Sequence, residues 1–150
     1  MDIDVLLERF GTDTGLGRLA LDEANTCSFL VDGMRVSLLH VVEGDRLLLY
    51  ADVEDLPDSG TEALLLSVLS ANYLFRGTAG ATLAVRPDSR TLFLNQSLHL
   101  EHTSYDDFVQ TLSDFTHTLA EWKRLIADYR PALSEAGPAA EAFLHDGIRI

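Results

Sequence analysis

Three groups of residues have types and spacings that could support chemistry. Gly77-Thr78-Ala79-Gly80 is a short glycine loop between apolar runs, and the backbone N–H groups of such loops can bind phosphate. His99 and His102 lie three positions apart and are potential metal ligands. Cys27 and His40 fall in successive strand-like runs, where a thiol and an imidazole could act as nucleophile and base.

Each group also has an ordinary structural interpretation, which we favour. A phosphate loop follows a strand and precedes a helix, whereas this glycine loop follows a helical segment and precedes a strand-like run. We therefore predict a helix stop, with Gly77 in the left-handed conformation and Gly80 allowing close backbone approach. The histidines lack the His-Glu-x-x-His order, and a cysteine in an alternating strand more often packs as a small hydrophobe.

The sequence consequently predicts no catalytic residue, no metal site and no cofactor. A small ligand-binding, regulatory or enzymatic α+β domain, with a pocket near Cys27 and His40, stays open as the alternative hypothesis.

Composition narrows the classes of partner. The 150 residues suit one domain, 47% of them are hydrophobic, and 11 basic against 24 acidic residues give a net charge of −13. That charge repels nucleic acid and anionic membranes. Cys27 is the only cysteine, so no disulfide can form within the chain. The first residues lack a long apolar run, and we expect a cytoplasmic protein.

The N-terminal half reads as a helix followed by three strands. Apolar residues from Ile3 to Phe10 have helical spacing, and Gly11 is expected to end this helix. Strands are predicted at residues 26–31, 34–42 and 46–53, joined by turns at Asp32-Gly33 and Gly44-Asp45. The resulting antiparallel meander is apolar on both faces, so both faces need cover.

The C-terminal half reads as helix, hairpin and helix. Residues 61–75 form a helix that is apolar nearly all round, which predicts burial against the sheet and against another subunit. A hairpin follows at residues 81–86 and 91–96. Ser104 and Asp107 resemble a capping box that opens the longest helix, which ends near Arg130. Its apolar stripe comprises Phe108, Leu112, Phe115, Leu119, Trp122, Ile126 and Tyr129.

These elements give a single-domain α+β fold in the order α-β-β-β-α-β-β-α, with an antiparallel sheet covered by helices. We assign residues 1–130 to this domain and residues 131–150 to a loosely ordered C-terminal tail.

A set of short motifs in this order resembles a known family. The motifs are Leu21-Asp22-Glu23, Thr26-Cys27, Val31-Asp32-Gly33, Leu47–Tyr50, Ala71-Asn72, the run from Gly77 to Leu83, and a helix carrying Phe108 and Trp122. Their order and spacing, together with the acidity and length of the chain, resemble the class I chaperones of type III secretion (the CesT/SycE-like family) over residues 1–130.

The resemblance implies a function without catalysis. Members of that family are small, acidic, cytoplasmic homodimers of gram-negative bacteria that share the fold order given above. They bind the N-terminal segment of a secreted effector, keep it non-globular and soluble, and assist its export. The implied partners are the effector and a second copy of the chain, with the export ATPase as a further candidate; the chaperone itself uses no ATP. A chaperone-like fold that regulates another bacterial protein is a third hypothesis.

The resemblance also implies sites. The expected effector-binding residues, for each of which ordinary core packing is the alternative, are Val5, Leu6, Phe10, Phe29, Leu38 and Leu49. The expected dimer contact comprises Leu65, Leu69, Tyr73, Leu83 and Val85, and Leu69→Asp or Leu83→Asp is expected to give a monomer.

Overall fold

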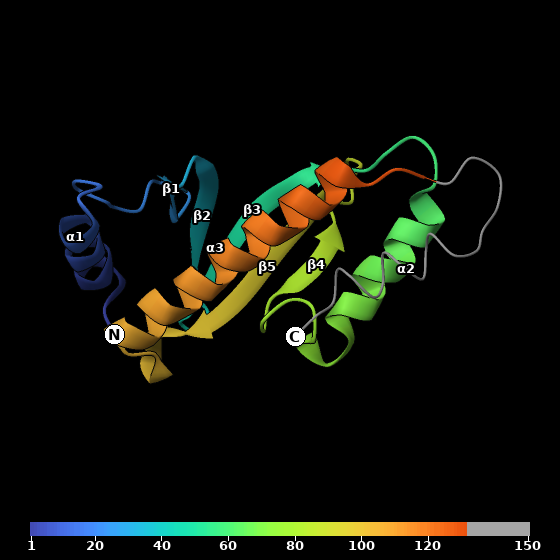
Figure 1. The fold of residues 1–150 in the computed structure, drawn as a ribbon. Coiled ribbons are helices and arrows are strands. Elements are labelled where there is room, and N and C mark those ends of the chain that lie inside the picture. Colours follow the sequence, from blue (N-terminus) through green and yellow to red (C-terminus); the bar gives the residue numbers. More distant parts are fainter. Residues whose placement is uncertain (132–150) are drawn as a thin grey trace. The chain divides into compact units, whose positions relative to one another are not determined.

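The computed structural model describes residues 1–131 (Figure 1). Its main elements are α1 (Ile3–Thr14), β1 (Thr26–Val31), β2 (Met34–Val41), β3 (Arg46–Asp55), α2 (Thr61–Asn72), β4 (Thr82–Val85), β5 (Thr91–His99) and α3 (Tyr105–Asp128). Short 3-10 helices occur at Tyr73–Phe75 and Leu100–His102. One five-stranded sheet has the order β1-β2-β3-β5-β4. The predicted α+β class and element order are confirmed. Of the predicted tail, residues 132–150 lie outside the described residues.

The first helix extends one turn beyond its predicted end. Its N-cap is Asp2, whose carboxylate accepts hydrogen bonds from the N–H groups of Asp4 and Val5. The helix ends at Gly15, which has a φ of 71°. Gly11, the predicted stop, lies inside the helix, where an added Cβ would stand 2.1 Å from the Gly17 carbonyl oxygen. That prediction was wrong because this glycine provides close contact rather than a left-handed turn.

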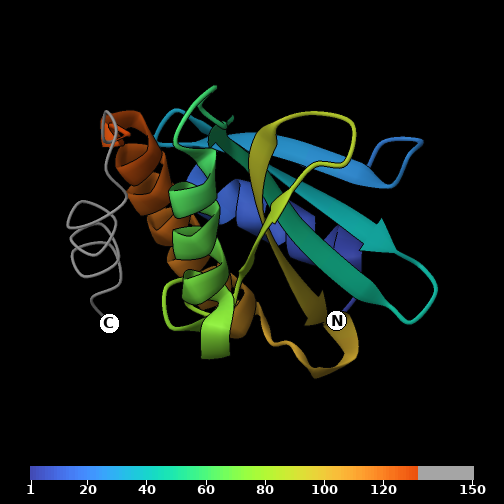
Figure 2. The same cartoon turned by 90° about the vertical axis from the view of Figure 1, so that its right-hand side faces the viewer.

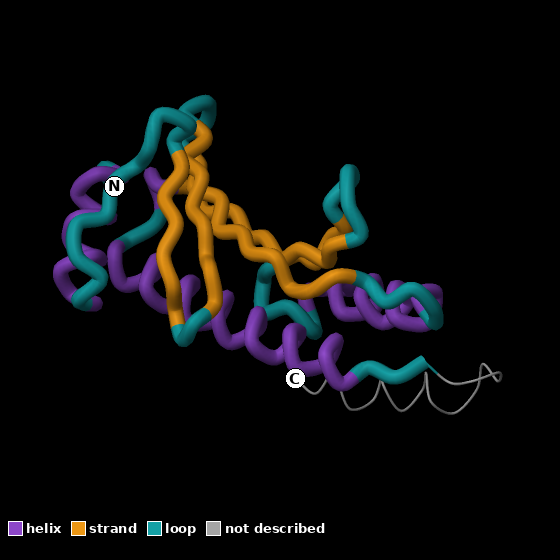
Figure 3. The backbone as a smooth tube through the Cα atoms, turned by 90° about the horizontal axis from the view of Figure 1, so that it is seen from above, coloured by secondary structure: helices purple, strands orange, loops and turns teal. Residues whose placement is uncertain are grey.

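The meander of β1, β2 and β3 contains both predicted turns. Asp32 and Gly33 have φ values of 49° and 78°, as a two-residue hairpin turn requires. Leu38 pairs with Cys27 on one side and with Leu49 on the other, so these three side chains share one face of the sheet. Figure 3 shows β1 and β2 running side by side and joined by the tight turn.

The described chain forms two compact units, and β3, β5 and α3 contribute residues to both. The first unit contains Met1–Ala51 and Asn95–Thr116. Within it, α1 and the start of α3 cover the same face of the meander (Figure 2). Phe10 carries this packing, because its ring lies 5.4 Å from the rings of both Phe29 and Phe108. The predicted capping box is present: the Ser104 hydroxyl donates to the Asp107 carboxylate at 2.6 Å.

The second unit contains Asp52–Leu94 and the chain from His117 onward. The indole Nε1 of Trp122 donates to the Gly77 carbonyl at 2.9 Å. The Asn72 amide bonds both the N–H and the C=O of Leu83, each at 2.9 Å, and so holds β4 beside α2. The predicted single domain over residues 1–130 stays a prediction.

Candidate functional site

The glycine loop is a structural connection. The Gly77 N–H donates to the Ala71 carbonyl at 2.9 Å, and the Thr78 N–H donates to the Phe75 carbonyl at 3.3 Å. These bonds use N–H groups that a phosphate would need. The two glycines have exchanged their predicted roles. An added Cβ on Gly77 would stand 2.7 Å from the Ala71 Cβ, whereas Gly80 has a positive φ of 91°. Close packing therefore requires Gly77, and backbone conformation requires Gly80.

Cys27 and His40 do not form a reactive pair. Burial raises the pKa of the Cys27 thiol, the nearby Asp22 carboxylate raises it further, and a bond from the Ala20 backbone opposes them. The His40 Nε2 pairs instead with the Asp45 Oδ1 at 3.0 Å. A buried thiol with a raised pKa is a poor nucleophile, so the structure does not favour the alternative of a reactive pocket here.

The described residues also contain no metal-binding cluster. No group of three or more histidine, cysteine, aspartate or glutamate side chains among them converges as a metal ion would require. His99 and His102 are both exposed. Nor is any helix of the described part long and apolar enough to cross a membrane.

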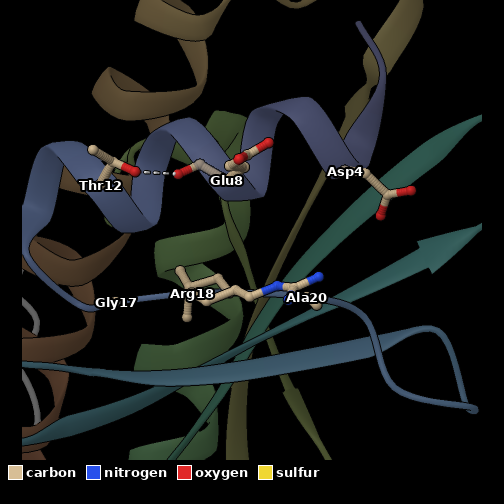
Figure 4. Close-up of a pocket in the computed structure, with 7 residues that line it drawn as sticks. Asp4, Glu8, Thr12, Gly17, Arg18 and Ala20 are labelled. Carbon is tan, nitrogen blue, oxygen red and sulfur yellow. Dashed lines mark hydrogen bonds between the residues drawn. The ribbon is translucent and has the colours of Figure 1, made fainter.

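A shallow trough lies between α1 and the segment that follows it. It measures about 850 Å³ and is lined by Asp4, Glu8, Thr12, Gly17, Arg18, Leu19 and Ala20. Figure 4 shows Arg18 reaching along the trough below the helix, while the Thr12 hydroxyl donates to the Glu8 carbonyl at 2.9 Å. Asp4, Glu8 and Arg18 are exposed to solvent, so the trough is not the dry setting in which enzymes shift carboxylate pKa values.

The sheet face of the first unit that points away from α1 offers a larger apolar surface, which we call the open face. Its side chains alternate with the core-facing ones along β1, β2 and β3, and one of them, Ser37, is itself buried. Leu39, Val41, Leu48 and Tyr50 are half-buried, and Leu30 is 58% exposed. The register places Leu39 opposite Leu48 and thus joins them in one patch. Apolar side chains left at the surface in this way are typical of a contact site for another polypeptide.

Strand β1 adds an unpaired edge to the open face. The His40 N–H donates to the Asn25 carbonyl, so alternation directs the backbone groups of Thr26, Ser28 and Leu30 away from β2. The outward backbone groups of Thr26 are already bonded to Asp22. The Asp22 N–H donates to the Thr26 carbonyl, and the Asp22 carboxylate accepts from the Thr26 N–H, both at 2.8 Å. No described residue bonds the outward backbone groups of Ser28 and Leu30. An extended peptide could add to the sheet there.

The Asp22 contact gives a prediction on pH. Hydrogen bonds from the Thr26 hydroxyl and from the backbone N–H groups of Thr26 and Ala24 lower the pKa of the Asp22 carboxyl below its ordinary value of 3.8. A carboxyl group whose pKa is lower in the folded state stabilises the protein when the pH is above the ordinary pKa. This stability is lost as the pH falls through the folded-state pKa. The natural protein should therefore have a higher free energy of unfolding than Asp22→Asn, and this difference should shrink below about pH 4. Urea unfolding at a series of pH values measures it. A difference that grows toward low pH would contradict it.

The residues expected to bind an effector divide sharply by burial. Val5 is 59% exposed. The other five are buried inside the first unit and are Leu6, Phe10, Phe29, Leu38 and Leu49. A second polypeptide cannot reach them unless the core opens, so the structure supports the core interpretation for these five. Residues of the open face were not among those expected.

The expected dimer residues divide in the same way. Leu69 and Tyr73 are 65% and 64% exposed, Leu65 and Val85 are at least partly exposed, and Leu83 is buried at 3%. The same part of the chain has three further exposed apolar side chains, Leu66, Leu74 and Phe75. The predicted helix over residues 61–75 is interrupted here, because Leu74 and Phe75 have φ values of 52° and 56°. Bulky residues rarely adopt this conformation, so the segment holds exposed apolar side chains at a conformational cost.

Comparisons with known proteins bear on this arrangement. A "Tir chaperone" from Citrobacter freundii is 28% identical over 91 residues, which are 61% of this chain and 58% of that relative. The alignment thus spans less than two thirds of the relative's length. The crystal structure of an ExsC–ExsE complex matches with a TM-score of 0.71 and 26% identity, covering 84% of this chain and 97% of the other. The HopA1–SchA chaperone–effector complex matches with a TM-score of 0.64 and 26% identity, covering 83% and 92%.

The family comparison is broader than the pairwise one. The model of the Tir chaperone protein (CesT) family matches residues 5–123, which include most of α1, all five strands, α2 and most of α3. The open face, the β1 edge and the exposed end of α2 all lie within the matched range. The chain therefore belongs to the Tir chaperone protein (CesT) family.

Proposed function

We propose that this protein is a type III secretion chaperone that binds the N-terminal segment of a secreted effector without catalysis. The observation that carries this proposal is the half-exposed apolar face of β1, β2 and β3, beside a free β1 edge, in a chain of this family. A polypeptide kept extended can bury apolar side chains on the face and bond its backbone to the edge. The matched complex of HopA1 with SchA, which is a chaperone–effector complex, supports the same role.

The proposed protein acts in the cytoplasm as a homodimer. The exposed apolar side chains around Leu69 and Tyr73 supply the contact between the two copies. The effector segment binds elsewhere, on the open face together with Val5 of α1. Contact with the export ATPase is a separate step, for which we assign no surface.

The test uses the full chain co-expressed with N-terminal fragments of secreted proteins encoded beside it. A chaperone should yield a soluble complex in which limited proteolysis spares an N-terminal fragment of roughly 50–100 residues, as an extended segment on this surface implies. The matched control is the same secreted protein without its N-terminal segment, which should not bind. A monomer at micromolar concentration that protects no N-terminal fragment would overturn the proposal.

A further inference from the structure

The open face carries unpaired positive charge in a strongly acidic protein. Most basic side chains of the described residues have a partner, such as Arg86, which pairs with Asp52. Among these residues, the side chains of Arg18, Arg35 and Arg46 have no ion pair, hydrogen bond or ring contact. Two of the three, Arg35 and Arg46, lie on the open face.

The register establishes that placement. Arg35 pairs with Leu30, which belongs to the open face, and Arg46 pairs with Val41, which also belongs to it. Both arginines are exposed. The remaining open-face residues of β1, β2 and β3 in this unit are Thr26, Ser28, Leu30, Ser37, Leu39, Val41, Leu48 and Tyr50. None of them is a carboxylate, although the whole chain has a net charge of −13.

The carboxylates beside this face lie in its two turns or are already bonded, since Asp22 accepts hydrogen bonds from Thr26, and Asp52, two positions after Tyr50 on β3, pairs with Arg86. Asp32 lies in the turn before Arg35, whereas Glu43 and Asp45 lie in the turn before Arg46. Asp45 already pairs with the His40 imidazole, and none of these carboxylates lies within ion-pair distance of either arginine. The two guanidinium groups are therefore available to a carboxylate brought by another chain.

The two arginines stand at opposite ends of the apolar patch. Arg46 lies opposite Val41, which is six positions along β2 from Arg35. At about 3.3 Å for each strand residue, the two positions are roughly 20 Å apart. Leu39 and Leu48 lie between them. The face thus has an apolar centre with one positive charge at each end.

We infer that the open face selects effector segments in which a short apolar stretch has a carboxylate on each side. This inference rests on the proposed function, because it assigns a chemistry to the segment that the chaperone binds. In an extended segment the two carboxylates are six positions apart, so both point to the same side as every second residue between them. The acidic remainder of the protein surface repels the two carboxylates, which favours binding of this stretch of the segment on the open face.

The test measures binding of dye-labelled twelve-residue peptides to the full chain by fluorescence anisotropy. The first peptide alternates leucine and threonine and carries two glutamates six positions apart. Two matched peptides replace both glutamates by glutamine or by lysine. We expect the glutamate peptide to bind roughly threefold to tenfold more tightly than the glutamine peptide at low salt, because two exposed ion pairs add modestly to affinity and are screened by salt.

The variant R35E/R46E should reverse this order, so that the lysine peptide binds best. R18E is the matched control, because it reverses an unpaired arginine of the same unit that lies off the face, and it should leave the order unchanged. Circular dichroism checks that each variant is folded, and R35Q and R46Q provide milder variants should the double reversal fail to fold.

Three results with the peptides would overturn the inference. They are equal affinity for the glutamate and glutamine peptides, an R18E effect as large as that of R35E/R46E, and no peptide binding. A (dT)12 oligonucleotide that binds the face more tightly than the glutamate peptide would also overturn it, since the arginines would then serve phosphate. The proposed function fails separately, only when no N-terminal effector fragment is protected from proteolysis.

Discussion

Phe10→Ala is expected to lower the free energy of unfolding by about 3–5 kcal/mol, the usual cost of removing a buried phenylalanine side chain. The Phe10 ring is 4% exposed and lies 5.4 Å from the rings of Phe29 and Phe108. Its removal leaves a cavity where α1, the meander and α3 meet inside the first unit. Urea unfolding followed by circular dichroism measures the loss.

The matched control is Val5→Ala, five positions earlier in the same helix. Val5 is 59% exposed, so its truncation should change the free energy of unfolding by no more than about 0.5 kcal/mol. If Phe10→Ala were equally mild and instead abolished effector binding, Phe10 would be a surface contact and our account of the core would be wrong. The two variants therefore separate the core residue from the contact residue on one helix.

This contrast shows what the alternation of strand residues can and cannot predict. Alternation places Phe29 and Leu38 on one face of the sheet and Leu39 and Leu48 on the other. It does not say which face α1 covers, because both faces are apolar. The residues that the resemblance implies for effector binding lie on α1 and on the face of the sheet that α1 covers. Five of these six residues are buried in the core.

The glycines mark a second limit of the sequence. Asp32-Gly33 was predictable because a two-residue hairpin needs positive φ at both positions. The sequence predicts conformational roles for Gly11 and Gly77, yet each makes a close contact with a residue six positions away, Gly17 and Ala71 respectively. Such contacts depend on how the chain folds back on itself and leave no periodic signal. The long apolar stripe of α3, by contrast, was predictable over its whole length because 3.6-residue periodicity continues for 24 residues.

Leu69→Asp is expected to convert the proposed homodimer to a folded monomer. Leu69 is 65% exposed on α2, beside Leu66 and Tyr73, so an aspartate there stays hydrated in the monomer. In a dimer formed through this patch, the same aspartate would be buried without a partner, which costs several kcal/mol. Light scattering after size exclusion at micromolar concentration should report the mass of one chain.

Two further aspartate variants make this result specific. Leu83 was expected to act like Leu69, but it is 3% exposed and its backbone is held by the Asn72 amide, so Leu83→Asp should unfold the protein instead. Leu30→Asp makes the same chemical change at an exposed residue of the open face. It should keep the dimer and weaken effector binding. A Leu69→Asp protein that stays dimeric would place the contact between the two copies elsewhere. A Leu30→Asp protein that becomes monomeric would place that contact on the open face. The open face could then not be free to bind the effector.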